Sequence, residues 1–376
     1  MNFDPRSPEF RSNPYPTYAL LREHAPIFYW EEWEMWFLST YEDCQALLRD
    51  PRLGNFPPGT SMLFQNPPDH TRMRSLVQKA FTPRMIEKQR EQVQATTDRL
   101  LDPVQGQGHM DIVKELAYPL PVAVIAEMMG VPVEDHAKFH EWSVALVNTL
   151  DLSRDPVKDE RGTDAEIAFE EYFAELIARR RKAPSDDLIS ALIAAEEEGD
   201  KLSARELYLN SRLLLIAGYE TTVGLIGNGL YALLTNPEEC KRLQADPMLI
   251  KGAIEELLRF DGPIQMVSRR AGEDIHYKGV TFAKDASVSF LLGSANRDPA
   301  RFPDADFLDI TRQSVQHMSF GAGIHYCLGA PLARLEGQIA INTVLRRMPN
   351  IFLAIDSPPY RDNYVFRGLE SLPVSF

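Results

Sequence analysis

Cysteine is scarce in this chain of 376 residues, and its three cysteines, Cys44, Cys240 and Cys327, lie far apart. An odd number of widely spaced cysteines argues against a disulfide framework and against a zinc site built from paired cysteines. Positive charge is also in short supply, because 40 Lys and Arg residues face 54 Asp and Glu residues and leave a formal net charge of −14. A surface field of that sign repels phosphate backbones and anionic lipids, so we expect neither a nucleic-acid nor a membrane partner.

The N-terminal region lacks a long apolar run. Residues 1–6 lead into charged, proline-rich sequence that fits neither a signal peptide nor a membrane span. We therefore expect a cytoplasmic protein. No fixed-period repeat or low-complexity linker divides the chain, which predicts a single domain over residues 1–376, and we expect it to be a monomer.

Helical periodicity dominates the chain up to about residue 260. It predicts a fold that is mainly α, with its helical bulk over residues 41–260 and 330–347, and a smaller β-rich part. The β-rich elements are expected near residues 27–40, 275–292 and 351–376. Within these regions the pattern predicts a hairpin at 27–38, strands at 276–282 and 287–292, and a terminal hairpin at 364–376.

One expected helix is unusually long. Ser203 and Glu206 have the spacing of a capping box, and no proline follows until Pro237. At about 1.5 Å per residue such a helix spans roughly 50 Å, enough to cross a whole domain. Its middle, residues 213–217, is apolar on every side and should be buried all round.

The segment from Phe320 to Gly329 reads Phe-Gly-Ala-Gly-Ile-His-Tyr-Cys-Leu-Gly and leads into a predicted helix. Its glycines allow a tight turn and the close approach of a flat ligand. Cys327 then lies at a helix N-terminus, where unpaired N–H groups favour a thiolate. A small buried cysteine beside a turn is the simpler interpretation. The alternative is a lone thiolate that suits the axial position of a haem iron.

The same segment resembles the haem-ligand loop of the cytochrome P450 family, Phe-x-x-Gly-x-His/Arg-x-Cys-x-Gly. Every fixed position is met, by Phe320, Gly323, His325, Cys327 and Gly329. The resemblance implies the cytochrome P450 fold, in which the long central helix crosses over the haem. It also implies haem b held by the Cys327 thiolate.

A second motif lies inside the predicted central helix, at residues 217–222, which read Ala-Gly-Tyr-Glu-Thr-Thr. On its own, a threonine bonded to the carbonyl four residues earlier explains the hydroxyls equally well. The family's central helix carries Ala/Gly-Gly-x-Asp/Glu-Thr over the haem. The resemblance therefore implies that Glu220 and Thr221 form the acid–alcohol pair that relays protons to bound dioxygen.

Glu256 and Arg259 are three residues apart on a predicted helix. Alone, such a pair is usually solvated and contributes about 0.2–0.5 kcal/mol. The resemblance to the family's Glu-x-x-Arg implies instead a buried structural pair, tied to the irregular segment around residues 296–302.

The resemblance also implies a set of haem contacts. His70 and Arg74 share one helix face, and without the resemblance they would be read as part of a basic surface. The implied partners of the haem propionates are His70, Arg74, Arg269 and His325. Further haem contacts are implied for Ala217, Phe320, Gly321 and Gly329.

The implied activity is that of a monooxygenase, which inserts one oxygen atom of O₂ into a hydrophobic organic substrate. The electrons would come from NAD(P)H through a separate ferredoxin-like donor and its reductase, because no flavin or iron–sulfur module fits in the remaining sequence. Two alternatives stay open. A peroxide-driven peroxygenase would tend to lose the acid–alcohol pair, and a haem-based gas sensor would need an output module.

Family position also gives candidates for the substrate pocket, and they are mostly apolar. They are Met62, Leu63, Phe64, Leu213, Ile216, Ala217, Gln265, Met266, Val267, Val365 and Phe366. The segment at 51–70 is short and proline-rich, so we expect no covering helix and an open pocket, unless the loop near residues 150–165 folds inward.

Five basic residues near the cysteine loop in the family's fold could form a docking patch for an acidic electron donor. They are Arg72, Lys79, Arg334, Arg346 and Arg347.

Overall fold

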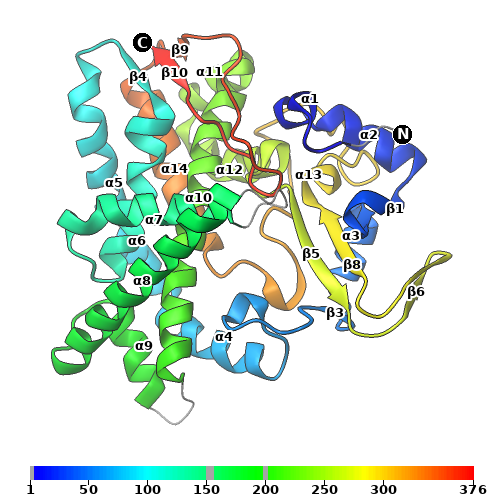
Figure 1. Cartoon of the computed structure of the whole chain (residues 1–376). Helices are drawn as coiled ribbons and strands as arrows, with labels where there is room; N and C mark the ends of the chain where they lie inside the picture. Colours follow the sequence, from blue (N-terminus) through cyan, green and yellow to red (C-terminus); the bar gives the residue numbers. More distant parts are fainter. Residues whose placement is uncertain (1–3, 150–155, 198–201) are drawn as a thin grey trace.

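The computed structural model describes residues 4–149, 156–197 and 202–376 (Figure 1). The α-helices are α1 Pro8–Ser12, α2 Tyr15–His24, α3 Tyr41–Leu47, α4 Asp69–Ala80, α5 Pro83–Gln105, α6 Pro119–Met128, α7 His136–Asn148, α8 Pro156–Lys182, α9 Leu188–Glu197, α10 Ala204–Thr235, α11 Pro237–Ala245, α12 Ile250–Asp261, α13 Leu292–Ala295 and α14 Ala330–Arg347. The strands are β1 Ile27–Trp30, β2 Met35–Leu38, β3 Leu53–Gly54, β4 His109–Asp111, β5 Met266–Ala271, β6 Ile275–Tyr277, β7 Val280–Phe282, β8 Ser287–Leu291, β9 Phe352–Leu353 and β10 Pro373–Ser375. Single helical turns are η1 Glu31–Trp33, η2 Met62–Phe64, η3 Val113–Ala117, η4 Val133–Asp135, η5 Pro247–Leu249 and η6 Gly323–His325. The predicted fold class, mainly α with a smaller β part, is confirmed.

The central helix α10 begins and ends as predicted. The Ser203 hydroxyl accepts from the backbone N–H of Glu206, and the Glu206 carboxylate accepts from the backbone N–H of Ser203 at 2.7 Å. Helices α6, α7, α12 and α14 pack around it. Its length and composition would also suit a membrane span, but 72% of its most apolar window is buried inside the protein, as expected for a core helix.

The larger sheet has the strand order β1-β2-β8-β5-β3. It lies on one side of the molecule, and helices α5, α6, α7 and α8 lie on the other side (Figure 1). β1 and β2 form the predicted hairpin, and β2 then pairs in parallel with β8, with Met35 opposite Ser287. A second sheet, β4-β10-β9, joins a strand from the first third of the sequence to two strands near its end.

Two strand predictions need correction, and one strand of the larger sheet was missed. Residues 276–282 form two strands rather than one, because Lys278 and Gly279 both adopt a positive φ and turn the chain into the β6–β7 hairpin. Residues 364–376 form no hairpin, since β10 pairs with β4 and β9 instead. Strand β5 was not predicted, because Ser268, Arg269 and Arg270 hide the alternation of a half-buried strand.

The short segment between α3 and α4 contains only β3 and the single turn η2, in agreement with the expectation of no covering helix. The segment is fastened to α10, because the backbone N–H of Met62 donates to Oδ1 of Asn210 at 3.0 Å. The loop near residues 150–165, whose inward folding was the alternative to an open pocket, falls partly on residues 150–155, which lie outside the described residues.

Candidate functional site

The loop that carries Cys327 is a tight turn stabilised by its own backbone. The N–H of Cys327 donates to the carbonyl oxygen of Phe320 at 2.9 Å. Gly321 and Gly323 both have a φ of +70°, which favours glycine. A side chain at position 323 would also come within 2.6 Å of the carbonyl oxygen of Leu48. The two glycines therefore allow the loop to fold back and present Cys327 just before α14.

Two opposing effects act on the Cys327 thiol. Burial raises its pKa, and the backbone N–H groups of Gly329 and Ala330 lower it, with a smaller contribution from the positive charges of Arg74 and Arg334. Burial is the largest effect, so the pKa of the thiol is raised overall. The helix N-terminus predicted to favour a thiolate is present, but it does not outweigh burial without a cation at the sulfur.

Four basic side chains from three elements come together beside this loop, and we call them the basic cluster: His70 and Arg74 of α4, Arg269 of β5 and His325 of the loop. The rings of His70 and His325 lie edge to face with centroids 4.4 Å apart. Nη2 of Arg74 donates to the carbonyl oxygen of Tyr326 at 2.6 Å. In Figure 1 the loop, in orange, is seen between α4 and β5.

The electrostatics of the basic cluster indicate a missing anion. Burial and the neighbouring positive charges lower the pKa of His325 to about 3, and burial lowers the pKa of Arg269 to about 10. Within the described residues, none of the four makes an ion pair with an acidic side chain. Nδ1 of His70 and Nε2 of His325 are buried and have no hydrogen-bond partner in the part of the chain that the structure describes. A buried anion with several acceptor oxygens would satisfy all of these groups.

One face of α10 is left open in the middle of the protein. Leu213, Ala217 and Thr221 are four residues apart and so share this face. Ala217 is exposed and Leu213 and Thr221 are half-buried, whereas Tyr219 and Glu220 between them are buried. We call these three residues the open face of α10, and a flat apolar group could lie against it.

The comparison with known protein families agrees with this geometry. The cytochrome P450 family model matches residues 37–359. The chain belongs to the cytochrome P450 family.

Its similar relatives are bacterial P450 enzymes. It is 42% identical to the polyketide biosynthesis cytochrome P450 PksS of Bacillus subtilis, over 99% of this chain and 98% of the relative. It is 43% identical to the biotin biosynthesis cytochrome P450 of the same organism, over 98% of each chain. A solved structure of P450BioI in complex with an acyl carrier protein ligated to hexadec-9Z-enoic acid superposes with a TM-score of 0.94, at 43% identity, covering 98% of this chain and 100% of that one. The chain is therefore a cytochrome P450 monooxygenase, and P450 enzymes hold haem through a cysteine thiolate.

The acid and the alcohol predicted on α10 point to different neighbours. Oγ1 of Thr221 donates to the carbonyl oxygen of Ala217 at 2.9 Å. This is the bond to the carbonyl four residues earlier, which many helix threonines make without any functional role. Thr221 is nevertheless half-buried on the open face, whereas Thr222, which bonds in the same way to Gly218, is buried. The Glu220 carboxylate forms an ion pair with Arg361 of the C-terminal segment. Sequence reasoning missed Arg361, because no local motif marks a partner so far along the chain.

Glu256 and Arg259 form a fully buried pair inside α12. Two N–H···O bonds of 2.7 Å join the guanidinium to the carboxylate. Arg259 also donates to the carbonyl oxygens of Asn296, Ala305 and Phe307, which lie in the irregular segment after β8. The pair therefore ties that irregular segment to α12.

The side chains predicted to line the substrate pocket divide into two groups. Leu63, Phe64, Leu213, Ile216, Ala217, Val267, Val365 and Phe366 are half-buried or exposed and remain candidates. Gln265 and Met266 lie elsewhere. Gln265 donates to the carbonyl of Gly262 and accepts from the Tyr18 hydroxyl, and Met266 packs in a core cluster with Tyr18. Alternation along β5 explains the difference, because Val267 and Arg269 share the other face of the strand. Met62 is buried in the main core.

The predicted basic docking patch is not a single surface. Arg72 pairs with Glu206, Arg334 with Glu255, and Arg347 with Asp98 and Asp102, so three of its five charges are neutralised. Arg334 and Arg346 are also 12 residues apart on α14, which places them about 18 Å apart along the helix axis. The remaining members are Arg346, exposed near the C-terminal end of α14, and Lys79, exposed in the last turn of α4.

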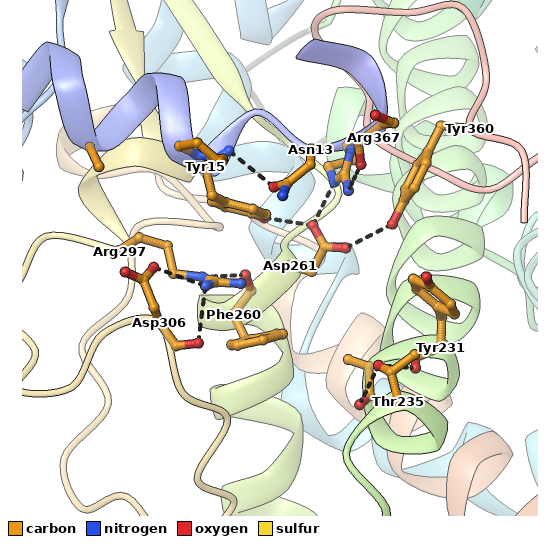
Figure 2. Close-up of a pocket in the computed structure, with 14 residues that line it drawn as sticks. Asn13, Tyr15, Tyr231, Thr235, Phe260, Asp261, Arg297, Asp306, Tyr360 and Arg367 are labelled. Carbon is orange, nitrogen blue, oxygen red and sulfur yellow. Dashed lines mark hydrogen bonds and ion pairs between the residues drawn. The ribbon is translucent and has the colours of Figure 1, made fainter. Parts of the chain in front are cut away.

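A pocket of about 480 Å³ lies outside this site, between α2, α10, α12 and the C-terminal segment (Figure 2). None of the predicted site residues lines it. Its floor is a network around Asp261, which accepts from the Tyr15 hydroxyl at 2.5 Å and from Nε of Arg367 at 2.6 Å.

Proposed function

We propose that this P450 holds haem b through Cys327 and uses it to insert oxygen into a hydrophobic organic substrate. The observation that carries the proposal is the basic cluster, four basic groups without an acidic partner in the described chain, beside a cysteine on a glycine turn. The two haem propionates supply the missing anion, and the open face of α10 supplies an apolar surface for the ring. Phe320, Gly321 and Gly329 would contact the haem from the cysteine loop.

The proposed reaction is R–H + O₂ + NAD(P)H + H⁺ → R–OH + H₂O + NAD(P)⁺. When bound, haem supplies the iron at which O₂ is reduced, and thiolate ligation favours O–O cleavage. The electrons would arrive from NAD(P)H through a separate ferredoxin-like protein and its reductase, in the cytoplasm.

The residues of the chain have distinct roles in this proposal. Arg74 and Arg269 would neutralise the propionates, and His70 and His325 would donate hydrogen bonds to them. Ala217 leaves room on the open face, because its side chain is small. Thr221 offers a hydroxyl on that face, and Glu220 would supply protons one residue away.

The relatives suggest which substrates to test first. One relative is named for polyketide biosynthesis, and another similar P450 was solved with a fatty acyl chain carried on a protein. We propose an extended acyl or polyketide chain as the substrate class, free or carrier-bound. The apolar side chains beside the open face, such as Ile216, Val365 and Phe366, suit a chain of this kind.

The absorption spectrum of the haem-loaded, reduced and CO-bound protein tests the ligand. We expect the Soret position of thiolate ligation, and the position of histidine ligation would contradict the proposal. Turnover of a fatty acid with NAD(P)H and redox partners, compared with turnover by hydrogen peroxide alone, then separates a monooxygenase from a peroxygenase. Efficient turnover by peroxide and none by NAD(P)H would favour the peroxygenase.

A further inference from the structure

We propose that the pocket of Figure 2 is a second ligand site, which binds a small aromatic carboxylate with Arg297 as the partner of the carboxylate group and Tyr231 beside the ring. The pocket lies outside the candidate haem site, so this inference goes beyond the proposed function and does not rest on it. Its volume of about 480 Å³ falls within the usual range of small-molecule sites, about 300–1,000 Å³. Ser12, Asn13 and Pro16 line it and are exposed, so a ligand can enter from the surface.

Arg297 is fixed in place by two aromatic rings. Its guanidinium carbon lies 4.0 Å from the ring centroid of Tyr15 and 3.7 Å from that of Phe260. The Arg297 side chain is only 6% exposed, so water competes little for its charge. A guanidinium packed against rings in this way still offers the N–H groups of its edge, which bind anions in the plane of the group. Arg297 is therefore a rigid and largely desolvated donor.

Part of the edge of this guanidinium is unused. Nε of Arg297 donates to the carbonyl oxygen of Phe260 at 2.8 Å, and Nη1 donates to Oδ1 of Asp306 at 3.1 Å. Over residues 4–149, 156–197 and 202–376, Nη2 forms no hydrogen bond. Because Arg297 lines the pocket, Nη1 and Nη2 offer the fork of donors that a carboxylate binds with two parallel bonds.

The two acids that line the pocket are held to different degrees. Asp261 is buried and accepts from the Tyr15 hydroxyl at 2.5 Å and from Nε of Arg367 at 2.6 Å, so its charge is neutralised in place. The side chain of Asp306 is 67% exposed. Ion pairs with such an exposed partner contribute little to stability. The carboxylate of a ligand can therefore replace Asp306 on Arg297, and Asp306 can turn to the solvent.

A second guanidinium adds to the positive field at Arg297. Burial lowers the pKa of Arg22, the charge of Arg297 lowers it further, and Asp298 and Asp306 raise it, so these four groups lie near one another. The carboxylate of Asp298 is fixed, because it accepts from two backbone N–H groups. Release of Asp306 would leave two guanidiniums facing one fixed carboxylate. The resulting positive charge is what the ligand would neutralise.

Tyr231 supplies a free aromatic surface. It lies half-buried on α10 and lines the pocket. In the part of the chain that the structure describes, its ring contacts no other ring and its hydroxyl has no hydrogen-bond partner. Tyr360, by contrast, already stacks on Arg367, at 3.7 Å. Figure 2 shows Tyr231 across the pocket from Arg297. Since pairs of rings attract one another beyond the apolar area that they bury, a ligand held by Arg297 gains most with an aromatic body.

The first test measures the binding of 2-naphthoate to the haem-loaded protein saturated with a bulky azole, which occupies the haem pocket. Calorimetric titration should show one site with a Kd of about 1 mM or lower, and the Soret band of the azole complex should stay unchanged. 2-Naphthamide, which lacks the charge, and decahydro-2-naphthoate, which lacks the aromatic ring, should bind severalfold more weakly. Displacement of the azole or the absence of saturable binding would overturn the proposal. Equal binding of either analogue would overturn the assigned ligand class.

The second test changes the competing acid. Asp306→Asn should tighten the binding of 2-naphthoate severalfold, because the ligand no longer displaces a carboxylate from Arg297. Asp304→Asn is the matched control, since Asp304 is an exposed acid of the same segment that does not line the pocket. It should leave the Kd unchanged. Equal Kd values in the two variants would refute the role of Arg297.

The third test locates the ligand. Ala19 is exposed on α2 and lines the pocket, so Ala19→Trp should fill the pocket and abolish binding. Leu20→Trp, at the exposed neighbouring position outside the pocket, should leave binding unchanged. Tyr231→Leu should weaken the binding of 2-naphthoate more than that of decahydro-2-naphthoate. Unchanged binding in Ala19→Trp would place the ligand elsewhere and overturn the proposal.

The direct variant, Arg297→Gln, should lose the preference for 2-naphthoate over 2-naphthamide. Because Arg297 is buried and bonded to Phe260 and Asp306, this variant can fail to fold. In that case Asp306→Asn and Ala19→Trp, which both change exposed positions, decide the proposal. A preference that survives in folded Arg297→Gln would contradict it.

Discussion

His70 and His325 meet edge to face, with ring centroids 4.4 Å apart, although one belongs to α4 and the other to the cysteine loop. Burial lowers the pKa of both rings, and the charges of Arg74 and Arg269 lower it further. Two imidazoles held neutral beside two guanidiniums form a site that attracts negative charge. Acid should therefore destabilise this part of the haem-free protein.

We expect the haem-free protein to lose stability as the pH falls below 6.5. In the unfolded chain His325 binds a proton near pH 6.5, whereas in the folded chain its pKa is about 3. Protonation of His325 in the unfolded chain therefore lowers the free energy of unfolding between these two pH values. At pH 5 the loss is about 1 to 2 kcal/mol, after allowance for the partial exposure of the ring. Denaturant unfolding of His325→Gln at pH 7 and pH 5 should show a smaller loss than the wild-type protein. The exposed His276→Gln serves as the control, and an equal loss in both variants would contradict this assignment.

Cys327→His should bind haem without the thiolate Soret position in the reduced, CO-bound spectrum. The reason is that Cys327 is the cysteine on the loop beside the basic cluster, whereas Cys44 and Cys240 are buried elsewhere. Cys240→Ala should keep the spectrum. Retention of the thiolate signature in Cys327→His would mean that another residue ligates the iron.

Thr221→Ala should keep haem binding but divert electrons from product to peroxide or water. Its hydroxyl lies on the open face of α10, where an oxygen-derived ligand would be bound. Thr222→Ala is the matched control, because it removes the same kind of bond on the buried side, at a cost of about 1 kcal/mol of folding stability. We expect the product per NAD(P)H to fall severalfold in Thr221→Ala and to stay unchanged in Thr222→Ala. Equal coupling in the two variants would exclude a proton relay through Thr221.

Charge reversal at Lys79 should slow reduction by an acidic electron donor more than charge reversal at Arg346. Lys79 lies on α4, which is bonded to the cysteine loop through Arg74, whereas Arg346 lies at the far end of α14. Stopped-flow reduction at increasing salt measures the effect, since exposed charges are screened beyond roughly 8–10 Å at physiological ionic strength. Reduction that is independent of salt would argue against electrostatic docking on this face.

Bulky azoles should bind to the haem-loaded enzyme, because the segment between α3 and α4 forms no covering helix in the described chain. Leu63 and Phe64 in this segment are more than one-third exposed. Phe64→Ala should weaken azole binding severalfold through the loss of an apolar contact, as measured by the shift of the Soret band. Leu20→Ala, on the exposed side of α2, should leave the affinity for the azole unchanged. Binding limited to very small azoles would show that another segment closes the pocket.

The sequence predicted those parts of the site that are local in the chain. The glycine turn, Cys327 and the capping box of α10 each depend on a few neighbouring residues, so their spacing is informative. The helical bulk over residues 41–260 and 330–347 was found for the same reason, because its apolar periodicity is continuous, whereas α1 and α2 lie outside the predicted helical ranges. Strand β6 and its partner β7 were merged because one positive-φ turn interrupts an otherwise strand-like pattern.

Contacts between distant segments could not be predicted. Arg361 meets Glu220 only because the C-terminal segment returns to α10, and nothing in the residues around Arg361 indicates that contact. Met266 was assigned to the pocket from its position after α12, but the alternation of β5 turns it into the core. The ion pairs of Arg72 and Arg347 likewise depend on helices packed from other parts of the chain.

The parallel pairing of β2 with β8 has a consequence for protein synthesis. Strand β2 is made early, but its inner edge stays unpaired until β8 has emerged from the ribosome. Arg269 lies on β5, opposite Val288 of β8, so its place in the sheet also depends on that late strand. A nascent chain therefore cannot assemble its haem pocket while most of it is being translated. Truncated products that end before β8 should lack pigment and should aggregate, because an unpaired strand edge recruits other chains.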